Sequence, residues 1–295
     1  MIRPLTDADL WTPDRCPACD STAPRSVVAT ANASPRVDWL ECSACRGTSY
    51  SRMPSDEYLD AFYAGYYASH RRPAHVDDAI WPRIANGILS QIQLDSARTG
   101  LRILDFGGGR GGVSLTIAKR LRSATVTIVD RSFELNHDSR TENGIPVECV
   151  RTLDQAPGEF DLVIASAVLE HVPLLAPVVR DLIGRVASGG GFYARTPYGL
   201  PLHKLSSRYE MHFPQHVHDL GPSFWNRLIE RYGIQARAVV SQPSIVESLF
   251  SDRPLGTLAA KILKFPGHVE RWIRHSPTDY LWRWVGGWEL FLTKA

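Results

Sequence analysis

Glycines beside a carboxylate form the most chemically informative stretch of the sequence. Asp105 is followed closely by a glycine-rich run that includes Gly107, Gly109, Gly111 and Gly112. Glycines let a chain turn tightly and let its backbone approach a nucleotide closely, as in the first turn of a dinucleotide site. The run lacks the lysine that a nucleoside triphosphate site would use. We interpret it as a nucleoside-binding turn between a strand and a helix.

Two carboxylates indicate which nucleoside this turn would bind. Asp130 ends the next β-branched strand, where a ribose-binding carboxylate belongs in NAD enzymes and in methyl-donor enzymes alike. Asp105 would repel the pyrophosphate of NAD, whereas S-adenosylmethionine has no phosphate and carries a sulfonium and an ammonium group. The charge pattern therefore favours S-adenosylmethionine. A NAD oxidoreductase and a turn that binds no ligand are the alternatives.

Four cysteines form two Cys-x-x-Cys pairs, made by Cys16 with Cys19 and by Cys42 with Cys45. Two residues between the thiols let both sulfurs face one tetrahedral metal, and the second pair completes the coordination. Such a site has no open position, so we expect a structural zinc ion. A redox role for one pair is the alternative. Cys149 lies in an apolar stretch and is expected to be a core residue.

Histidine is the natural general base near neutral pH, and two regions offer it. His171, in a Glu-His pair after the fourth expected strand, is equally well interpreted as a base or as an orienting group. The second region contains His203, His212, His216 and His218. We favour His216 or His218 as the base. A His-rich surface loop, or a second metal site at His212, His216 and His218, are the alternatives.

Alternating apolar segments predict the elements that position these residues. Strands are expected at 102–106, 126–130, 147–150, 160–166, 192–196, 234–241 and 287–294. Helices are expected near 79–95, from 113 to 121, from 175 to a stop at Gly189, and at 223–232. Strands alternating with helices imply βαβ units and a mostly parallel sheet, so the fold class is α/β. Ligands bind beyond the carboxyl ends of such strands.

The stretches LDFGGGRGG, IVD, FDLVIASAVLEHV and GGGFYARTPY, in this order up to Tyr198, resemble the class I S-adenosylmethionine-dependent methyltransferase superfamily. The resemblance implies a Rossmann-like seven-stranded sheet whose last strand, Trp288–Thr293, inserts antiparallel. It also implies that Asp105 and the backbone of Gly107, Gly109 and Gly111 hold the methionine part of the donor, and that Asp130 holds the ribose. Ser166 is assigned to the same donor site. The usual acidic adenine contact after the third strand has no clear counterpart, because Asp154 is displaced.

We expect three regions: a zinc-binding module at 1–55, a helical and aromatic linker and lid at 56–98, and a methyltransferase domain at 99–295 with an insert at about 242–286. Tyr63, Tyr66 and Tyr67 are expected to cover the donor or to pack between module and sheet. The insert combines tryptophans with arginines, which suits a lipid surface but is more common in ordinary packing; we expect packing.

Composition limits the partners. The formal net charge is +2, and residues 1–60 contain six arginines, no lysine and nine acidic residues, which disfavours nucleic acid. The sequence shows neither a signal peptide nor an apolar run of membrane-spanning length, so a cytoplasmic enzyme without a membrane partner is expected. The oligomeric state is not predicted.

A four-cysteine ribbon followed by a Tyr-rich segment also resembles enzymes that methylate sugars and other small metabolites. We therefore expect a methyltransferase acting on a small polar acceptor, with O-methylation of a sugar or secondary metabolite favoured. The alternatives are an RNA methyltransferase that docks its substrate through the ribbon and a non-catalytic donor-binding scaffold.

Overall fold

The structure is a computed structural model that describes residues 3–31, 33–69, 74–92, 94, 99–121, 123–131, 139–205, 213–245, 254–275 and 280–295. Within these ranges, residues 66–69, 74–79, 139–140 and 254–257 are described by their backbone alone. Of the described helices, none is both long and apolar enough to cross a membrane.

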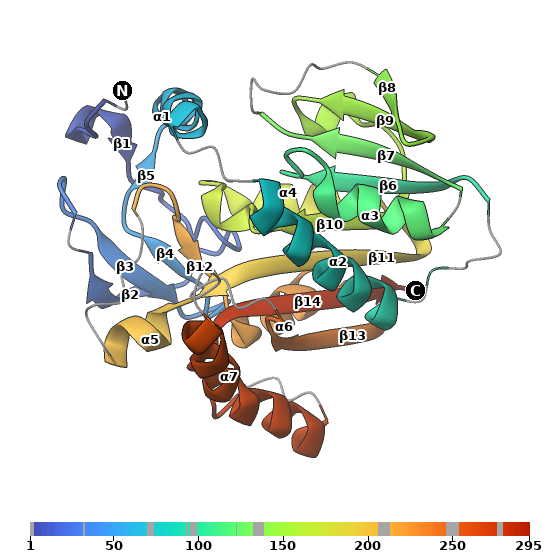
Figure 1. Ribbon diagram of the computed structural model, residues 1–295. Coiled ribbons are helices and arrows are strands. Elements are labelled where there is room, and N and C mark those ends of the chain that lie inside the picture. The colour runs from blue at the N-terminus through green and yellow to red at the C-terminus, as the bar shows by residue number, and fades with distance from the viewer. Residues whose placement is uncertain are drawn as a thin grey trace.

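An eight-stranded sheet forms the centre of the molecule (Figure 1). Its strands lie in the order β13 (Ala236–Pro243), β14 (Gly286–Lys294), β11 (Val186–Tyr198), β10 (Phe160–Ser166), β6 (Leu101–Phe106), β7 (Ala124–Val129), β9 (Ile145–Val150) and β8 (Ser139–Glu142). The five strands from β11 to β9 are parallel. As expected, the last strand of the chain, β14, inserts antiparallel between β11 and β13.

The prediction of seven strands was wrong by one. The additional strand, β8, pairs antiparallel with β9 at the edge of the sheet. Asn143 and Gly144 connect the two strands, and both adopt positive φ, of 50° and 81°. An Asn-Gly pair is the preferred connection of a two-residue hairpin, because both central residues of a type I′ turn need positive φ. This signal was present in the sequence.

Helices cover both faces of this sheet: residues of α2 (Ala74–Gln91) and α3 (Gly112–Leu121) pack on one face, and residues of α4 (Leu175–Gly184) and α6 (Pro222–Arg231) pack on the other. The chain also forms α1 (Asp56–Ser69), α5 (Leu200–Leu205) and α7 (Pro254–Arg274), with short 3₁₀ turns η1 (Asp7–Asp9), η2 (Leu153–Gln155) and η3 (Leu169–His171). The helix expected to stop at Gly189 ends at Gly184, because Val186 already pairs with Phe160 in the sheet.

Strand alternation divides the core into two clusters. Leu162 and Ile164 of β10 point to the cluster that contains α2 and α3 residues, whereas Val163 and Ala165 point to the cluster that contains α4 and α6 residues. Successive side chains of a strand face opposite sides of a sheet, so a continuous apolar run requires cover on both faces. This explains why β10 is buried along almost its whole length.

The N-terminal region forms a second, smaller sheet beside the first (Figure 1). Its order is β12 (His218–Asp219), β4 (Thr48–Tyr50), β3 (Asp38–Cys42) and β2 (Arg25–Thr30), and β1 (Leu10–Trp11) pairs separately with β5 (Met53–Pro54). β12 comes from the segment after β11, far along the chain. The cysteine module at 1–55 is thus completed by a strand from the methyltransferase region.

Candidate functional site

The glycine turn lies where β6 meets α3, and Asp105 is buried beneath it with 3% of its surface exposed. The Ser114 hydroxyl donates a hydrogen bond of 2.6 Å to Asp105 Oδ2. Burial raises the pKa of Asp105 to about 7, opposed by the hydrogen bond from Ser114 and reinforced by the negative charge of Asp130. A cation placed against this carboxyl group would favour its ionised form.

Backbone conformation explains the need for glycine in the turn. Gly107, Gly109 and Gly111 have φ of +66°, +54° and +76°, which disfavours any residue with a Cβ atom. A Cβ on Gly108 would lie 2.4 Å from the Asp105 carboxyl carbon, whereas one on Gly109 would meet no atom within 4 Å. The Asp105 carboxyl group therefore packs directly against the turn at Gly108, and the turn is open at Gly109.

Asp130 follows β7 and reaches the same turn. The Gly109 amide donates a hydrogen bond of 2.8 Å to Asp130 Oδ2, although the two residues are 21 positions apart. The backbone also connects the segments, since the Gly107 amide donates to the Val129 carbonyl at 2.7 Å. The structure thus brings Asp105, the glycines and Asp130 together at the carboxyl edge of the sheet.

The end of β10 packs directly against this turn. A Cβ on Gly107 would lie 2.2 Å from Val168 Cγ2. Between β10 and Val168, Ala167 adopts a φ of 56°, which is strained for a residue with a side chain, and its amide donates to the Arg195 carbonyl at 2.8 Å. The Ser166 hydroxyl accepts a hydrogen bond of 3.2 Å from Arg195 Nε. Ser166 is therefore close to the glycine turn, and its partner Arg195 is a neighbour that the sequence analysis did not name.

His171 lies in η3, just beyond this strained turn, in a defined tautomer. Its Nδ1 is 2.6 Å from the Gln215 carbonyl oxygen and 3.0 Å from the Tyr63 hydroxyl. A carbonyl oxygen can only accept, so Nδ1 carries a proton and Nε2 of the neutral ring presents a lone pair. His171 is arranged as a proton acceptor at Nε2. Tyr63, from α1, packs edge-on against its ring at 5.8 Å.

Glu170 and His216 complete a group around His171. Glu170 is 2% exposed, and its Oε1 lies 3.9 Å from His171 Nε2. Within the described part of the chain, Glu170 Oε2 has no hydrogen-bond partner, and burial raises the pKa of this carboxyl group. The His216 ring lies 4.8 Å from the His171 ring. One ligand atom of each residue lies within 4.8 Å of the others, so the group could bind a proton or a divalent cation.

His218 is placed differently from His171 and His216. It is fully buried, its Nε2 donates to the Val172 carbonyl at 2.8 Å, and its Nδ1 accepts from the Ser49 hydroxyl at 2.7 Å. Burial lowers the pKa of His218 to about 4. Both ring nitrogens serve internal hydrogen bonds, so this geometry supports a packing role rather than the role of a base. His212 lies outside the described residues.

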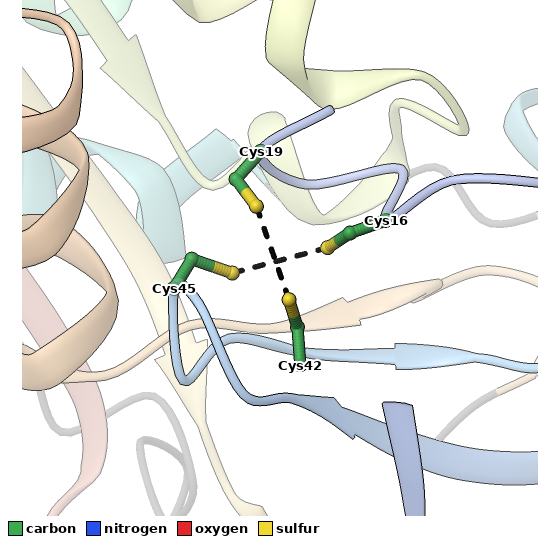
Figure 2. Close-up of side chains that lie close together, drawn as sticks. All are labelled: Cys16, Cys19, Cys42 and Cys45. Atoms are coloured by element: carbon green, nitrogen blue, oxygen red, sulfur yellow. Dashed lines mark hydrogen bonds between the residues drawn. The ribbon is translucent and has the colours of Figure 1, made fainter. Parts of the chain in front are cut away.

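The four cysteines converge from two loops of the N-terminal module (Figure 2). Cys16 Sγ lies 3.8 Å from Cys45 Sγ, and Cys19 Sγ lies 3.9 Å from Cys42 Sγ. Four sulfurs, each about 2.3 Å from a shared zinc ion in tetrahedral geometry, would be about 3.8 Å apart. All four side chains are buried, and none forms a disulfide. Donor type, number and spacing therefore fit a closed zinc site.

The cysteine module is part of the main core. Its cysteines belong to the same buried cluster as Leu175 of α4 and Phe224 of α6. The Pro17 carbonyl, between the first two cysteines, accepts hydrogen bonds from the Leu175 and Ala176 amides at 2.9 and 3.1 Å. These amides belong to the unpaired donors at the start of α4, so the metal loop caps this helix.

The module also contacts the segment that carries the histidines. The Val217 amide donates to the Glu170 carbonyl at 2.7 Å, and the Tyr50 amide donates to the Val217 carbonyl at 3.2 Å. A continuous set of backbone contacts thus runs from β4 to η3. The cysteine module holds His216 and His171 in their relative positions.

Comparison with known proteins identifies the family. Residues 73–239, more than half of the chain, match the profile of a family described as a methyltransferase domain. The chain belongs to this family. Its resemblance to class I S-adenosylmethionine-dependent methyltransferases is thereby confirmed.

Individual relatives match shorter segments. A ubiquinone biosynthesis O-methyltransferase of Chromobacterium violaceum is 34% identical over 116 residues, covering 37% of this chain and 49% of the relative. A malonyl-[acyl-carrier protein] O-methyltransferase of Geobacter sulfurreducens is 29% identical over 140 residues, covering 45% of this chain and 52% of the relative. The chain thus matches about half the length of these relatives. The plantazolicin methyltransferase BpumL, solved with SAH, matches with a TM-score of 0.48 at 17% identity, covering 75% of this chain and 88% of that structure.

Proposed function

We propose that this protein transfers a methyl group from S-adenosylmethionine to a hydroxyl group of a small polar acceptor. The observation that carries the proposal is the placement of a buried carboxyl group, Asp105, beneath an open glycine turn that touches the strand end leading to Glu170 and His171. One part of this edge suits a cationic nucleoside, and the adjoining part suits removal of a proton.

In the donor half, we assign contacts with the methionine part to Asp105 and to the backbone of Gly107, Gly109 and Gly111. Asp130 would accept hydrogen bonds from the ribose hydroxyls, and Ser166 would line the donor near Arg195. S-adenosylmethionine supplies a methyl group already activated on a sulfonium. The protein therefore needs chiefly to align the acceptor oxygen with this methyl group and to exclude water, and alignment can lower the barrier by about 7–11 kcal/mol.

In the acceptor half, His171 Nε2 would accept the hydroxyl proton as the carbon–oxygen bond forms and the carbon–sulfur bond breaks. Glu170 would stabilise the resulting imidazolium, and the Gln215 carbonyl keeps the ring oriented throughout. His216 is close enough to bind the acceptor or to relay the proton. A base of this kind contributes about 10²–10⁴ in rate.

The activities of two relatives support an oxygen acceptor, because both proteins named above are O-methyltransferases. A trans-aconitate 2-methyltransferase of Rhodopseudomonas palustris, 31% identical over 122 residues, also acts on a small molecule. A sugar or secondary metabolite remains our proposed acceptor class. The zinc ion is proposed as structural, because four cysteines leave no open position for a substrate.

The test is transfer of label from methyl-labelled S-adenosylmethionine to a cell extract separated into small molecules and RNA, with donor binding measured by calorimetry. We expect binding of the donor and label in the small-molecule fraction as a base-stable ether. Label in the RNA fraction would favour docking of RNA through the cysteine module and overturn the proposal. Binding without transfer would favour a donor-binding scaffold, and absence of binding would remove the donor assignment.

A further inference from the structure

The helix α7 carries a concentration of exposed apolar side chains. Ten large hydrophobic residues are exposed in the described part of the chain, and six of them lie between positions 258 and 281. They are Leu258, Ile262, Phe265, Trp272, Ile273 and Leu281, with exposed fractions from 54% to 79%. Scattered exposed hydrophobic residues are normal, but a contiguous group of this kind marks an interaction surface.

The spacing of these residues places them on one face of the helix. Leu258, Ile262, Phe265 and Trp272 follow one another at intervals of four, three and seven residues, and Ile273 lies eight residues after Phe265. Residues at such intervals form a single stripe on an α-helix. The opposite face is used for packing, since Ala260 and Lys264 are 2% and 4% exposed.

The stripe is accompanied by positive charge. Residues 254–275 contain Lys261, Lys264, Arg271 and Arg274 but a single acidic residue, Glu270, a net of 4 − 1 = +3. Of these cations, Lys261 is exposed beside the stripe, whereas Arg274 pairs with Glu270 at 2.5 Å on the other side of the helix. Glu270 is turned inward, where it accepts hydrogen bonds from the Leu281 and Trp282 amides at 2.7 and 2.8 Å.

The protein holds α7 firmly from its packed face. Lys264 Nζ donates to the Ser244 carbonyl at 3.1 Å, and Arg271 donates to the Gln242 side chain at 2.5 Å. The Trp282 indole donates to the Leu263 carbonyl at 2.7 Å. The exposed stripe is therefore presented on an anchored helix, which projects from the body of the molecule (Figure 1).

The strand that leads to α7 ends at the same edge of the sheet as the candidate site. β13 runs parallel to β11, because both pair antiparallel with β14. The end of β13, from which the chain leads to α7, therefore lies at the same edge of the sheet as Asp105 and Ser166. A surface that contacts α7 would lie on the side from which an acceptor approaches.

We infer that α7 docks this protein on an anionic lipid surface, with its apolar stripe in the headgroup region and Lys261 against the lipid charges. Amphipathic helices with Trp, Phe and Leu on one face and cations beside it bind in this way, without crossing the bilayer. A second copy of the chain fits less well, because Glu270, the single acidic residue of α7, is already paired with Arg274, and a two-fold contact between the helices would offer Lys261 no carboxylate. This inference goes beyond the proposed reaction and does not depend on it.

The experiment is co-sedimentation of the purified full chain with phosphatidylcholine vesicles that do or do not contain one third phosphatidylglycerol. We expect binding that is stronger with phosphatidylglycerol and weakens with salt. The Ile262→Glu/Phe265→Glu variant should reduce the partition coefficient at least about tenfold. Lys261→Glu should weaken binding to the anionic vesicles and leave binding to neutral vesicles unchanged. Thermal unfolding checks the fold of each variant, since all three side chains are exposed.

The matched control is Val27→Glu/Val239→Glu, which places the same charges at exposed apolar positions on β2 and β13 and should bind as the unmodified chain does. Absence of vesicle binding, or equal losses in the control and the α7 variant, would overturn the inference. Sedimentation velocity tests whether the chain forms a dimer. A dimer that the Ile262→Glu/Phe265→Glu variant dissociates would show that a second copy covers the stripe, which would also overturn it.

Discussion

The Ser49 hydroxyl of the cysteine module donates a hydrogen bond of 2.7 Å to Nδ1 of His218, a residue 169 positions later in the chain. Through Nε2 the same ring donates to the Val172 carbonyl, at the end of the η3 turn that carries His171. A single buried imidazole therefore connects the module to the candidate acceptor site. The module is part of the framework of this site.

This relationship makes Ser49 important for stability. Ser49→Ala would leave a buried ring nitrogen without a donor, and we expect the free energy of unfolding to fall by about 1–3 kcal/mol. Thr30→Ala removes an exposed hydrogen bond from the Thr30 hydroxyl to Asp38 in the same sheet. This substitution should change the free energy of unfolding by less than about 0.5 kcal/mol. Urea denaturation measures both. Equal stability of the two variants would contradict this account of His218.

The metal site gives a second prediction. The purified chain should contain one zinc ion, measured by elemental analysis, because four buried thiols surround one position. Cys42→Ser should lose this zinc and several kcal/mol of stability, since metal binding and folding are coupled. Cys149→Ser, in buried β9 away from the cluster, is the control and should retain the zinc. A zinc-free chain of unchanged stability would exclude a structural metal.

Removing the charge of Asp105 should weaken donor binding. Asp105→Asn keeps the size of the side chain but withdraws the carboxylate proposed to face the sulfonium and ammonium groups, so we expect S-adenosylmethionine affinity to fall at least about tenfold. Calorimetry measures the dissociation constant. The fold should survive, because an uncharged amide is easier to bury than a carboxylate. Unchanged affinity would remove Asp105 from the donor site.

The raised pKa of Asp105 predicts two opposite pH effects. With the folded-state pKa at about 7 and an ordinary value of 3.8, the folded chain holds this proton more tightly than the unfolded chain. Its contribution to stability is complete below about pH 4 and is lost as the pH rises through 7. Donor affinity should instead rise about tenfold from pH 6 to pH 8, because only the ionised group attracts the cation.

Asp105→Asn provides the control for these pH effects. It should flatten the pH dependence of donor affinity and reduce the pH dependence of stability. The pH dependence of stability should fall only in part, because burial also raises the pKa of Asp219 to about 7 and this group still titrates. Calorimetry and urea denaturation at several pH values measure the two slopes. A pH profile of donor affinity that is identical in the variant would refute the role of this group.

The histidines should separate into two classes. If His171 accepts the proton, His171→Gln should lower kcat by about 10²–10⁴ while the dissociation constant for the donor product stays unchanged. His216→Gln should lower kcat or raise KM for the acceptor. His218→Gln should chiefly lower the free energy of unfolding. Steady-state kinetics with the acceptor identified by labelling, together with denaturation, distinguishes these results. A kcat loss confined to His218→Gln would reverse the assignment.

Much of the sheet was predictable because its signals are local. Apolar runs marked β6, β7, β10 and β14, and the two Cys-x-x-Cys pairs marked the four-cysteine cluster. The edge strand β8 was missed, because this strand has no apolar pattern. The Asn143-Gly144 pair, which is typical of a hairpin, was the available signal. The positions of Asp105, Asp130 and the glycines followed from the rule that parallel strands end at one edge.

Contacts between distant segments could not be read from the sequence in the same way. His216 and His218 are two residues apart, and nothing in their spacing distinguishes the residue beside His171 from the one buried against Ser49. Pairing of β12 with β4 decides this, because it places His218 opposite Ser49, whereas His216 precedes the strand. Arg195 was missed for a related reason, because only the pairing of β10 with β11 brings it to Ser166.

The sequence by itself therefore determined the fold class, the glycine turn and the set of four cysteines, since each depends on residue types at short spacings. The tertiary structure decided which histidine is available for chemistry, how the cysteine module supports that histidine, and which face of α7 is exposed. Those properties depend on burial and on partners far apart in the chain, and burial is defined only when the whole chain has folded.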